Sequence, residues 1–270
     1  MNILIAILAA LIALGVILWI GLKVTPKPLP PLPAREVGLE TISLLDGLPG
    51  PVGRFYRTMY GDQIPVIESA IISGRAKMRM FGISLPGRFR FVHEAGMNYR
   101  HYIEVTWFGF PILKVNELYL DGNSRLELPF GVTENEPKIN QAANLGLWAE
   151  SVWLPPIFIT DPRVSWEPVN DDTAMLRIPY GEERETFLVR FNPQTGLLSH
   201  TEAMRYKEAS DETKTLWINE AIEWQVLNGQ LALTVGAVTW FGEGTAWAVF
   251  SVDEVVFNLD VSETVQRRGL

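Results

Sequence analysis

The first 22 residues of this chain carry no charged side chain, and this feature constrains the fold more than any other. The run from Ile3 to Leu22 is almost entirely Ile, Leu, Ala, Val and Gly, with Trp19 near its end. As a helix rising about 1.5 Å per residue, it would span about 30 Å, the thickness of the hydrocarbon core of a bilayer. We therefore predict a single transmembrane anchor over residues 1–22.

A cleaved signal peptide is the alternative interpretation of this segment. Such a peptide has a basic N-terminal region, a shorter apolar core and a small-residue cleavage site. Met1 and Asn2 are not basic, and residues 21–25 offer no convincing cleavage site. We expect the helix to be retained. The chain has no cysteine, which excludes a lipid-modified cysteine and disulfides but does not indicate a compartment.

Residues 23–34 form a predicted proline-rich linker. The stretch from Thr25 to Pro33 reads TPKPLPPLP and holds five prolines in nine residues. Such a sequence favours polyproline II and acts as a semi-rigid spacer of roughly 3.1 Å per residue, so it could reach about 28 Å. We expect a stalk that holds the following domain off the membrane.

The region after the linker is acidic. Once Lys23 and Lys27 are set aside, it carries 21 basic and 31 acidic residues, a net charge of −10. This balance argues against a nucleic-acid partner, because phosphate neutralisation requires a basic face. It also argues against an electrostatic attraction to anionic lipid. We expect the helix alone to provide the link to the membrane.

The periodicity of residues 35–270 predicts one mainly β domain. Two short helices are expected at 35–45 and 51–60, and an amphipathic helix at 135–150. From about Ile67 the period is two, as in strands. We count about eleven strands with no βαβ rhythm, which predicts one large antiparallel curved sheet (a half-barrel) packed on a few helices. Beyond the first strands after Ile67, the expected strands are 99–107, 111–120, 163–167, 174–179, 186–191, 197–206, 215–224, 231–240 and 249–260.

Two motifs resemble a bacterial family of unknown function whose members usually carry an N-terminal membrane helix. Residues 48–57 read LPGPVGRFYR, and residues 148–156 read WAESVWLPP before a Trp-Glu-Pro at 166–168. The resemblance covers most of residues 45–260 and implies no activity. The architecture it implies is similar to the LolA and LolB lipoprotein-carrier half-barrel, a fold-level analogy in which a curved sheet wraps an apolar concavity. A retained anchor would distinguish this chain from a shuttle.

The charges next to the helix and the resemblance point to opposite sides of the membrane. Lys23, Lys27 and Arg35 all follow the helix, and the positive-inside rule would place the domain in the cytoplasm. The carrier-like architecture implies the outer side. We follow the architecture and expect a single-pass protein of the cytoplasmic membrane with its domain on the periplasmic side.

Motifs for nucleophilic or cofactor chemistry are absent from the sequence. There is no Gly-x-Ser-x-Gly, Ser-x-x-Lys, Walker or Rossmann pattern and no cysteine. His93 and His101 flank a predicted hairpin and with Glu94 or Glu104 could make a weak metal site, but zinc needs three or four ligands and no third is evident. His200 fits ordinary strand alternation. We expect no catalytic residue, no metal and no cofactor.

Acidic pairs leave an envelope hydrolase as a third-ranked function. Glycoside hydrolysis needs two carboxyl groups at a set separation. Glu182, Glu183 and Glu185 lie together, but they fit a solvated turn and strand edge. In a chain with 31 acidic residues, proximity in the sequence does not identify such a pair.

The aromatic content gives the sharper functional hypothesis. Eight of the nine tryptophans follow the anchor, and many lie on predicted strands. They fit a large β core, and they also fit an apolar cavity between sheet and helices that accepts a lipid or another hydrophobic small molecule. We expect a membrane-tethered, non-enzymatic ligand-binding domain, with an accessory subunit that contacts a membrane-protein partner as the alternative. The predicted ligand-binding residues are Phe89, Phe91, Trp107, Phe187, Trp217 and Trp240.

Overall fold

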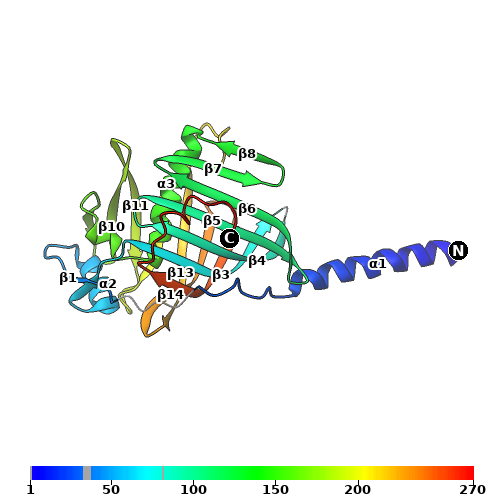
Figure 1. Cartoon of the computed structure of the whole chain (residues 1–270), viewed down its shortest axis with the longest axis horizontal. Coiled ribbons are helices and arrows are strands. Elements are labelled where there is room, and N and C mark those ends of the chain that lie inside the picture. The colour runs from blue at the N-terminus through cyan, green and yellow to red at the C-terminus, as the bar shows by residue number, and fades with distance from the viewer. Residues whose placement is uncertain (1, 33–37, 81) are drawn as a thin grey trace.

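The computed structural model describes residues 2–32, 38–80 and 82–270. Helix α1 (Asn2–Lys23) projects from the rest of the molecule, as Figure 1 shows. Its Ile, Leu and Val side chains are exposed along its length. By length and composition, Ile3–Lys23 is a candidate membrane span.

One 13-stranded antiparallel sheet dominates the structure, and it confirms the predicted mainly β fold. Consecutive strands pair from β3 to β8 and again from β9 to β14, and β15 joins the two series by pairing with both β3 and β14. The sheet ends at β8 and β9 and does not close into a barrel. Its strands are β3 (Ser69–Met80), β4 (Ile83–Glu94), β5 (Asn98–Trp107), β6 (Phe110–Leu120), β7 (Asn123–Leu128), β8 (Gly131–Glu134), β9 (Ser165–Asn170), β10 (Thr173–Tyr180), β11 (Glu183–Phe191), β12 (Leu198–Arg205), β13 (Thr215–Leu227), β14 (Gln230–Trp240) and β15 (Ala248–Phe257).

Four short helices cover one face of the sheet, which we call the inner face. They are α2 (Gly50–Tyr60), α3 (Pro137–Glu150), the 3-10 helix η1 (Ser151–Trp153) and α4 (Ile157–Thr160). Helices α2 and α3 confirm two of the helix predictions, and each begins with a proline in its first turn, where the missing N–H costs nothing. Residues from all four helices and from most strands form one apolar core.

The predicted first helix at 35–45 is wrong over the described part of that range. Residues 35–37 lie outside the described residues. Thr41–Ser43 form strand β1, which pairs with β2 (Gln63–Pro65) in a separate two-stranded sheet. The strand pairing outweighs the weak helical periodicity of this short segment, because Ile42 and Leu44 then pack against the main core.

Two segments outside the helices and strands pack on the opposite, outer face of the sheet. The proline-rich segment crosses β4, where Arg88 Nη1 donates to Lys27 O at 3.1 Å and Arg90 donates to Pro30 O. Leu29 is 5% exposed. The expectation of a free stalk is therefore wrong for residues 24–32. The strand arginines satisfy carbonyl groups that a polyproline segment leaves without internal partners.

The segment after β15 completes the outer layer. Val261 and Val265 pack with Ile71 and Val92 in a small second core. Figure 1 shows this dark red segment crossing β3 to β5. Arg100 Nη1 donates to Thr264 O at 3.3 Å, so the segment is also held by polar contacts.

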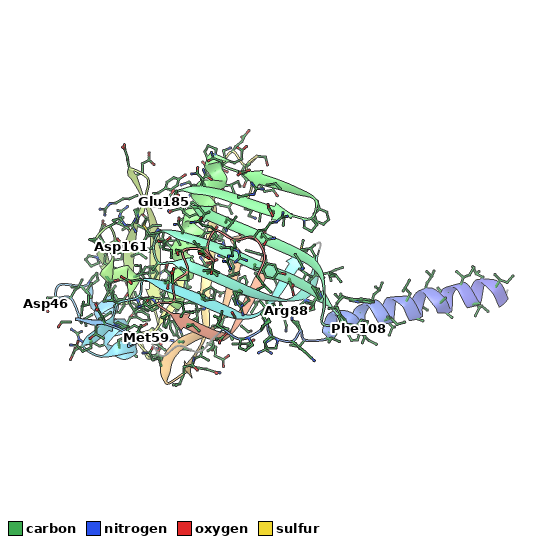
Figure 2. The ribbon with its side chains drawn as sticks, in the orientation of Figure 1. Asp46, Met59, Arg88, Phe108, Asp161 and Glu185 are labelled. Carbon is green, nitrogen blue, oxygen red and sulfur yellow. The ribbon has the colours of Figure 1, made fainter. Side chains whose placement is uncertain are left out.

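The C-terminal end of α1 contacts the β5–β6 hairpin directly. Trp107 Nε1 donates to Leu18 O at 3.1 Å, and the Phe108 N–H donates to Gly21 O at 2.9 Å. A Cβ at Gly21 would overlap the Trp107 indole, so glycine permits this close approach. Figure 2 shows Phe108 beside the base of the helix. Helix α1 therefore leaves the domain at one hairpin tip.

Candidate functional site

Two histidines lie on the inner face of neighbouring strands. In the β4–β5 pairing, His93 is opposite Tyr99 and Phe91 is opposite His101, so the two histidines are diagonal neighbours. The turn between the strands contains Gly96 with φ 67°, which fixes this register. The two imidazole centroids are 6.0 Å apart. The structure thus confirms that these histidines come together across the hairpin.

A carboxylate from helix α3 reaches both histidines. Glu150 is the last residue of α3, and its Oε2 lies 2.7 Å from His101 Nε2 and 3.0 Å from His93 Nε2. The contact with His101 is a hydrogen bond. The contact with His93 lacks the alignment of a hydrogen bond. By this geometric criterion, both ring nitrogens of the buried His93 lack a hydrogen-bond partner among the described residues.

A second carboxylate holds His101 from the other side. Glu117 is directly opposite His101 in the β5–β6 pairing, and its Oε2 lies 3.4 Å from His101 Nδ1. The Tyr99 hydroxyl donates to Glu117 Oε1 at 2.6 Å, and the Tyr99 ring stacks on His101 with centroids 4.1 Å apart. We call His93, Tyr99, His101, Glu117 and Glu150 the polar cluster.

The electrostatics of the polar cluster separate its two histidines. Burial lowers the pKa of His101, but the charges and hydrogen bonds of Glu150 and Glu117 outweigh burial and raise it to about 9. For His93 burial outweighs the attraction to Glu150, and the pKa is lowered. Burial acts to raise the pKa of Glu150, but His101 and His93 lower it to about 2. At neutral pH, His101 is therefore an imidazolium between two carboxylates, and His93 is neutral.

Arg205 adds a second, half-buried cation at the edge of the polar cluster. Burial lowers its pKa, and the negative charges of Glu117 and Glu150 act against that shift. Its Nε donates to Ala142 O at 3.0 Å. Its guanidinium lies 4.3 Å from the ring centre of Trp217. Arginine commonly stacks on tryptophan in this way.

A cavity of about 120 Å³ lies beside the polar cluster, between α3, η1 and the inner face of the sheet. His101, Glu117, Glu150 and Arg205 contribute to one part of its wall, and most of the rest is apolar. Several lining residues on β13 and β14 are only half-buried, so the cavity lies close to the protein surface. The apolar wall includes Phe91, Ile103, Ala149, Val152, Trp153, Leu198, Trp217, Ala221, Leu233, Ala237, Val238, Trp247 and Phe250.

The six aromatic residues predicted to bind a ligand occupy different places. Phe91 and Trp217 line the cavity. Phe89 packs on Phe91 with ring centroids 4.5 Å apart, and Trp240 lies 6.3 Å from Trp217, so both are next to cavity-lining rings without lining the cavity. Phe187 is buried in the core on β11. The Trp107 side chain contacts α1.

The two glutamates of the polar cluster were not identified from the sequence. The sequence suggested Glu94 or Glu104 as partners of the histidines. Glu104 instead forms an ion pair with Arg88 at 2.6 Å, and Glu94 accepts a hydrogen bond from Asn98. Strand alternation could have excluded both glutamates. Glu94 shares β4 with His93, and Glu104 shares β5 with His101. Each is an odd number of residues from that histidine, so its side chain lies on the opposite face of the sheet.

The arrangement can hold either a proton or a metal ion. In the first case, His101 is protonated between its two carboxylates, as described above. In the second, His93, His101 and Glu150 each offer one ligand atom, and these atoms all lie within 4.8 Å of one another. Two imidazoles and one carboxylate form a common donor set for zinc and other divalent transition metals.

Comparisons with known proteins identify a family and list solved structures with a low level of similarity. Residues 39–252 match a family described as "Family of unknown function (DUF6544)". No curated protein matches the chain. The chain is similar to a DUF1329 family protein from Desulfovibrio piger, with 13% identity and a TM-score of 0.43 over 74% of this chain and 89% of that chain.

Two further solved structures have a comparable likeness. A putative outer membrane lipoprotein-sorting protein domain from Vibrio parahaemolyticus is 9% identical with a TM-score of 0.42, over 80% of this chain and 95% of that chain. A LolA superfamily protein from Nitrosomonas europaea is 8% identical with a TM-score of 0.45, over 74% of this chain and 89% of that chain.

Proposed function

This chain belongs to DUF6544, a family of unknown function, and we propose a function from its own geometry. In this proposal it is a membrane-tethered, non-enzymatic protein. It binds the apolar part of a lipid or of another hydrophobic small molecule. The cavity beside the polar cluster carries this proposal. Its wall is mostly apolar, and a few polar groups are gathered on one part of it. Apolar pockets with a few convergent polar groups are the usual form of small-molecule sites.

The size of the cavity limits what it holds. Its volume of about 120 Å³ is close to the roughly 150 Å³ of an engineered apolar cavity that binds benzene. It therefore suits a small apolar group or the end of an acyl chain, while the rest of a lipid would lie outside. In this proposal Phe91 and Trp217 contact the bound apolar group directly.

Native mass spectrometry of the full chain extracted from membranes tests the ligand. The Ala221→Phe substitution places a large ring in the cavity, and Ile222→Phe, on the next residue of β13, is the matched control because Ile222 is exposed. We expect a lipid mass on the wild-type chain and on I222F, and its loss from A221F. Lipid held only by α1 would persist in both variants, and that outcome would reject the proposal.

The same spectra test the alternative role as an accessory subunit. In that role the domain would hold a membrane-protein partner instead of a lipid. A stoichiometric protein mass that stays bound to A221F, with no lipid on the wild-type chain, would favour the accessory subunit over the ligand-binding protein.

Exposed apolar residues near the base of α1 support the membrane part of the proposal. Phe110 is 75% exposed, and Ile112 on the same strand is also exposed. Both lie on β6, just after the turn of the hairpin that contacts the end of α1. Apolar side chains placed beside a membrane span can rest at the bilayer surface, where burial of their area is favourable.

Because the chain has no cysteine, single labelled cysteines can test this contact. Phe110→Cys and Val226→Cys would each carry an environment-sensitive dye, and Val226 is an equally exposed residue on β13. In lipid nanodiscs we expect a blue-shifted emission at position 110 and a solvent-like emission at 226. Solvent-like emission at both positions would contradict the membrane contact.

We also propose that the domain faces the periplasmic side of the cytoplasmic membrane. Labelling of Val226→Cys in intact cells with a maleimide that cannot cross the cytoplasmic membrane tests this orientation. We expect labelling without lysis of that membrane. Labelling only after lysis would place the domain in the cytoplasm, as the positive-inside rule predicts.

A further inference from the structure

The polar cluster contains a donor set that goes beyond the binding of an apolar group. We propose that His93 Nε2, His101 Nε2 and Glu150 Oε2 bind one divalent transition-metal ion, for which zinc is a suitable probe. The three residues come from β4, β5 and the end of α3, and each offers one ligand atom within 4.8 Å of the other two. This proposal does not depend on what occupies the cavity.

The distances fit a site that needs only a small expansion. Ligand atoms about 2.0–2.2 Å from a tetrahedral zinc ion lie roughly 3.3 Å from each other. Glu150 Oε2 lies 3.0 Å from His93 Nε2 and 2.7 Å from His101 Nε2. Both Glu150 distances would lengthen by a few tenths of an ångström to reach that spacing, and the two histidine ligand atoms would need to lie at a similar distance from each other.

His93 supplies the independent observation. Its side chain is 0% exposed, and neither of its ring nitrogens has a hydrogen-bond partner among the described residues. A buried imidazole without well-aligned partners loses its hydration without full compensation, which is unfavourable. A metal bond to Nε2 would compensate this loss more fully than the 3.0 Å contact with Glu150, which is poorly aligned for a hydrogen bond.

His101 is oriented as metal-binding histidines usually are. The Glu117 carboxylate lies at its Nδ1, on the side away from Glu150, and Tyr99 holds Glu117 in turn. A carboxylate on the second nitrogen fixes the tautomer and makes the metal-binding nitrogen more basic. This arrangement directs Nε2 to the shared point with His93 and Glu150.

The cavity leaves room for a further ligand. His101 and Glu150 both line the cavity, so the ion would be next to it. Three protein ligands with one open position are typical of zinc sites that bind water or a substrate atom, whereas structural zinc sites use four. The open position would hold water or an oxygen atom of a molecule in the cavity.

Metal content of the untagged, full-length chain in detergent provides the test. After removal of bound metal with a chelator, the chain is dialysed against zinc and the zinc per folded chain is measured by mass spectrometry. We expect about one ion per wild-type chain, as for a single site. His200→Gln is the matched control, because His200 is the third histidine and is not in the cluster.

Variants of the ligands locate the site. His93→Gln and Glu150→Gln should each lose zinc affinity by at least about tenfold, and Glu117→Gln should weaken it by about 10–100-fold through His101. Circular dichroism shows whether each variant is folded. Folded H93Q and E150Q that keep wild-type affinity would overturn the proposal, as would a wild-type chain that binds no stoichiometric zinc.

A measurement on unmutated ligands decides the question if those variants do not fold. Pulsed electron paramagnetic resonance of the Cu²⁺-loaded wild-type and His200→Gln chains detects imidazole nitrogen at the metal. Signals from two imidazoles in both chains support the site. Signals from fewer than two, or their loss in H200Q, would contradict it.

Discussion

The inner face of the sheet is covered differently at α2 and at α3. At α2, the buried side chains Val52, Phe55 and Tyr56 pack on strand residues such as Phe191 and Trp224. Both regions border a small cavity, but only the cavity at α3 is lined by charged groups. Buried charges and empty volume both reduce stability. The contrast indicates that the apolar α2 region contributes more to stability than the α3 region, where charged groups are buried.

The largest expected effect on stability is in the α2 region. Phe55→Ala removes a ring that is 2% exposed and leaves a cavity, so the free energy of unfolding should fall by about 3–5 kcal/mol. Chemical denaturation of the full chain in detergent measures it. Phe130→Ala is the control, because Phe130 is 79% exposed and should change stability by less than about 0.5 kcal/mol. Equal losses in both variants would show that Phe55 does not stabilise the core.

Loss of a carboxylate in the α3 region should have the next largest effect. Glu150→Ala leaves the His101 imidazolium with Glu117 alone, and removing one partner of a buried ion pair costs about 3 kcal/mol. The same denaturation experiment applies, with Glu182→Ala at an exposed turn as control. A loss no greater than that of E182A would mean that Glu150 is solvated in the folded protein.

A single hydroxyl in the α2 region should have a smaller effect. The Tyr56 hydroxyl is buried and donates to Pro155 O at 2.6 Å. Tyr56→Phe removes that hydrogen bond and leaves the carbonyl without it, so we expect a loss of about 1–1.5 kcal/mol. Thermal unfolding followed by circular dichroism measures the change. An unchanged transition would show that water replaces the hydroxyl.

The smallest change in stability, and the sharpest contrast with Tyr56, is expected at His93. His93→Leu replaces a buried ring without hydrogen bonds by an apolar side chain, so metal-free stability should change by less than about 1 kcal/mol or increase. Zinc should stabilise the wild-type chain but not H93L. A metal-free loss as large as that of Y56F would mean that His93 makes a hydrogen bond in the folded protein.

Local sequence patterns were sufficient to predict much of the fold. The hairpin turn at Asp121-Gly122 has positive φ at both residues, as such a dipeptide predicts. In β4, Phe89, Phe91 and His93 lie at alternate positions and are all buried, as period-two alternation predicts for one face of a strand. The 41–43 region was missed because its strand is held by residues 63–65, and pairing with a distant partner leaves no local signal.

The sequence was sufficient to predict the proximity of the two histidines of the candidate site, but not the positions of its two glutamates. The two histidines are eight residues apart across one hairpin, so their proximity could be predicted. Glu150 is 49 residues from His101, and only the packing of α3 on the sheet brings it there. Glu117 requires the register of the next hairpin, which includes a shift between Val105 and Thr106. Turn residues alone do not predict that irregularity.

The position of β15 has a consequence for the kinetics of folding. Its residues pair with β3, about 180 positions earlier in the sequence, as the Arg75–Asp253 ion pair of 178 residues' separation illustrates. During synthesis, the β3–β8 and β9–β14 series can form while the edges of β3 and β14 remain unpaired. Contacts of such long range form slowly, and exposed strand edges promote aggregation. The nascent chain therefore has a period in which a chaperone that shields strand edges would improve its yield.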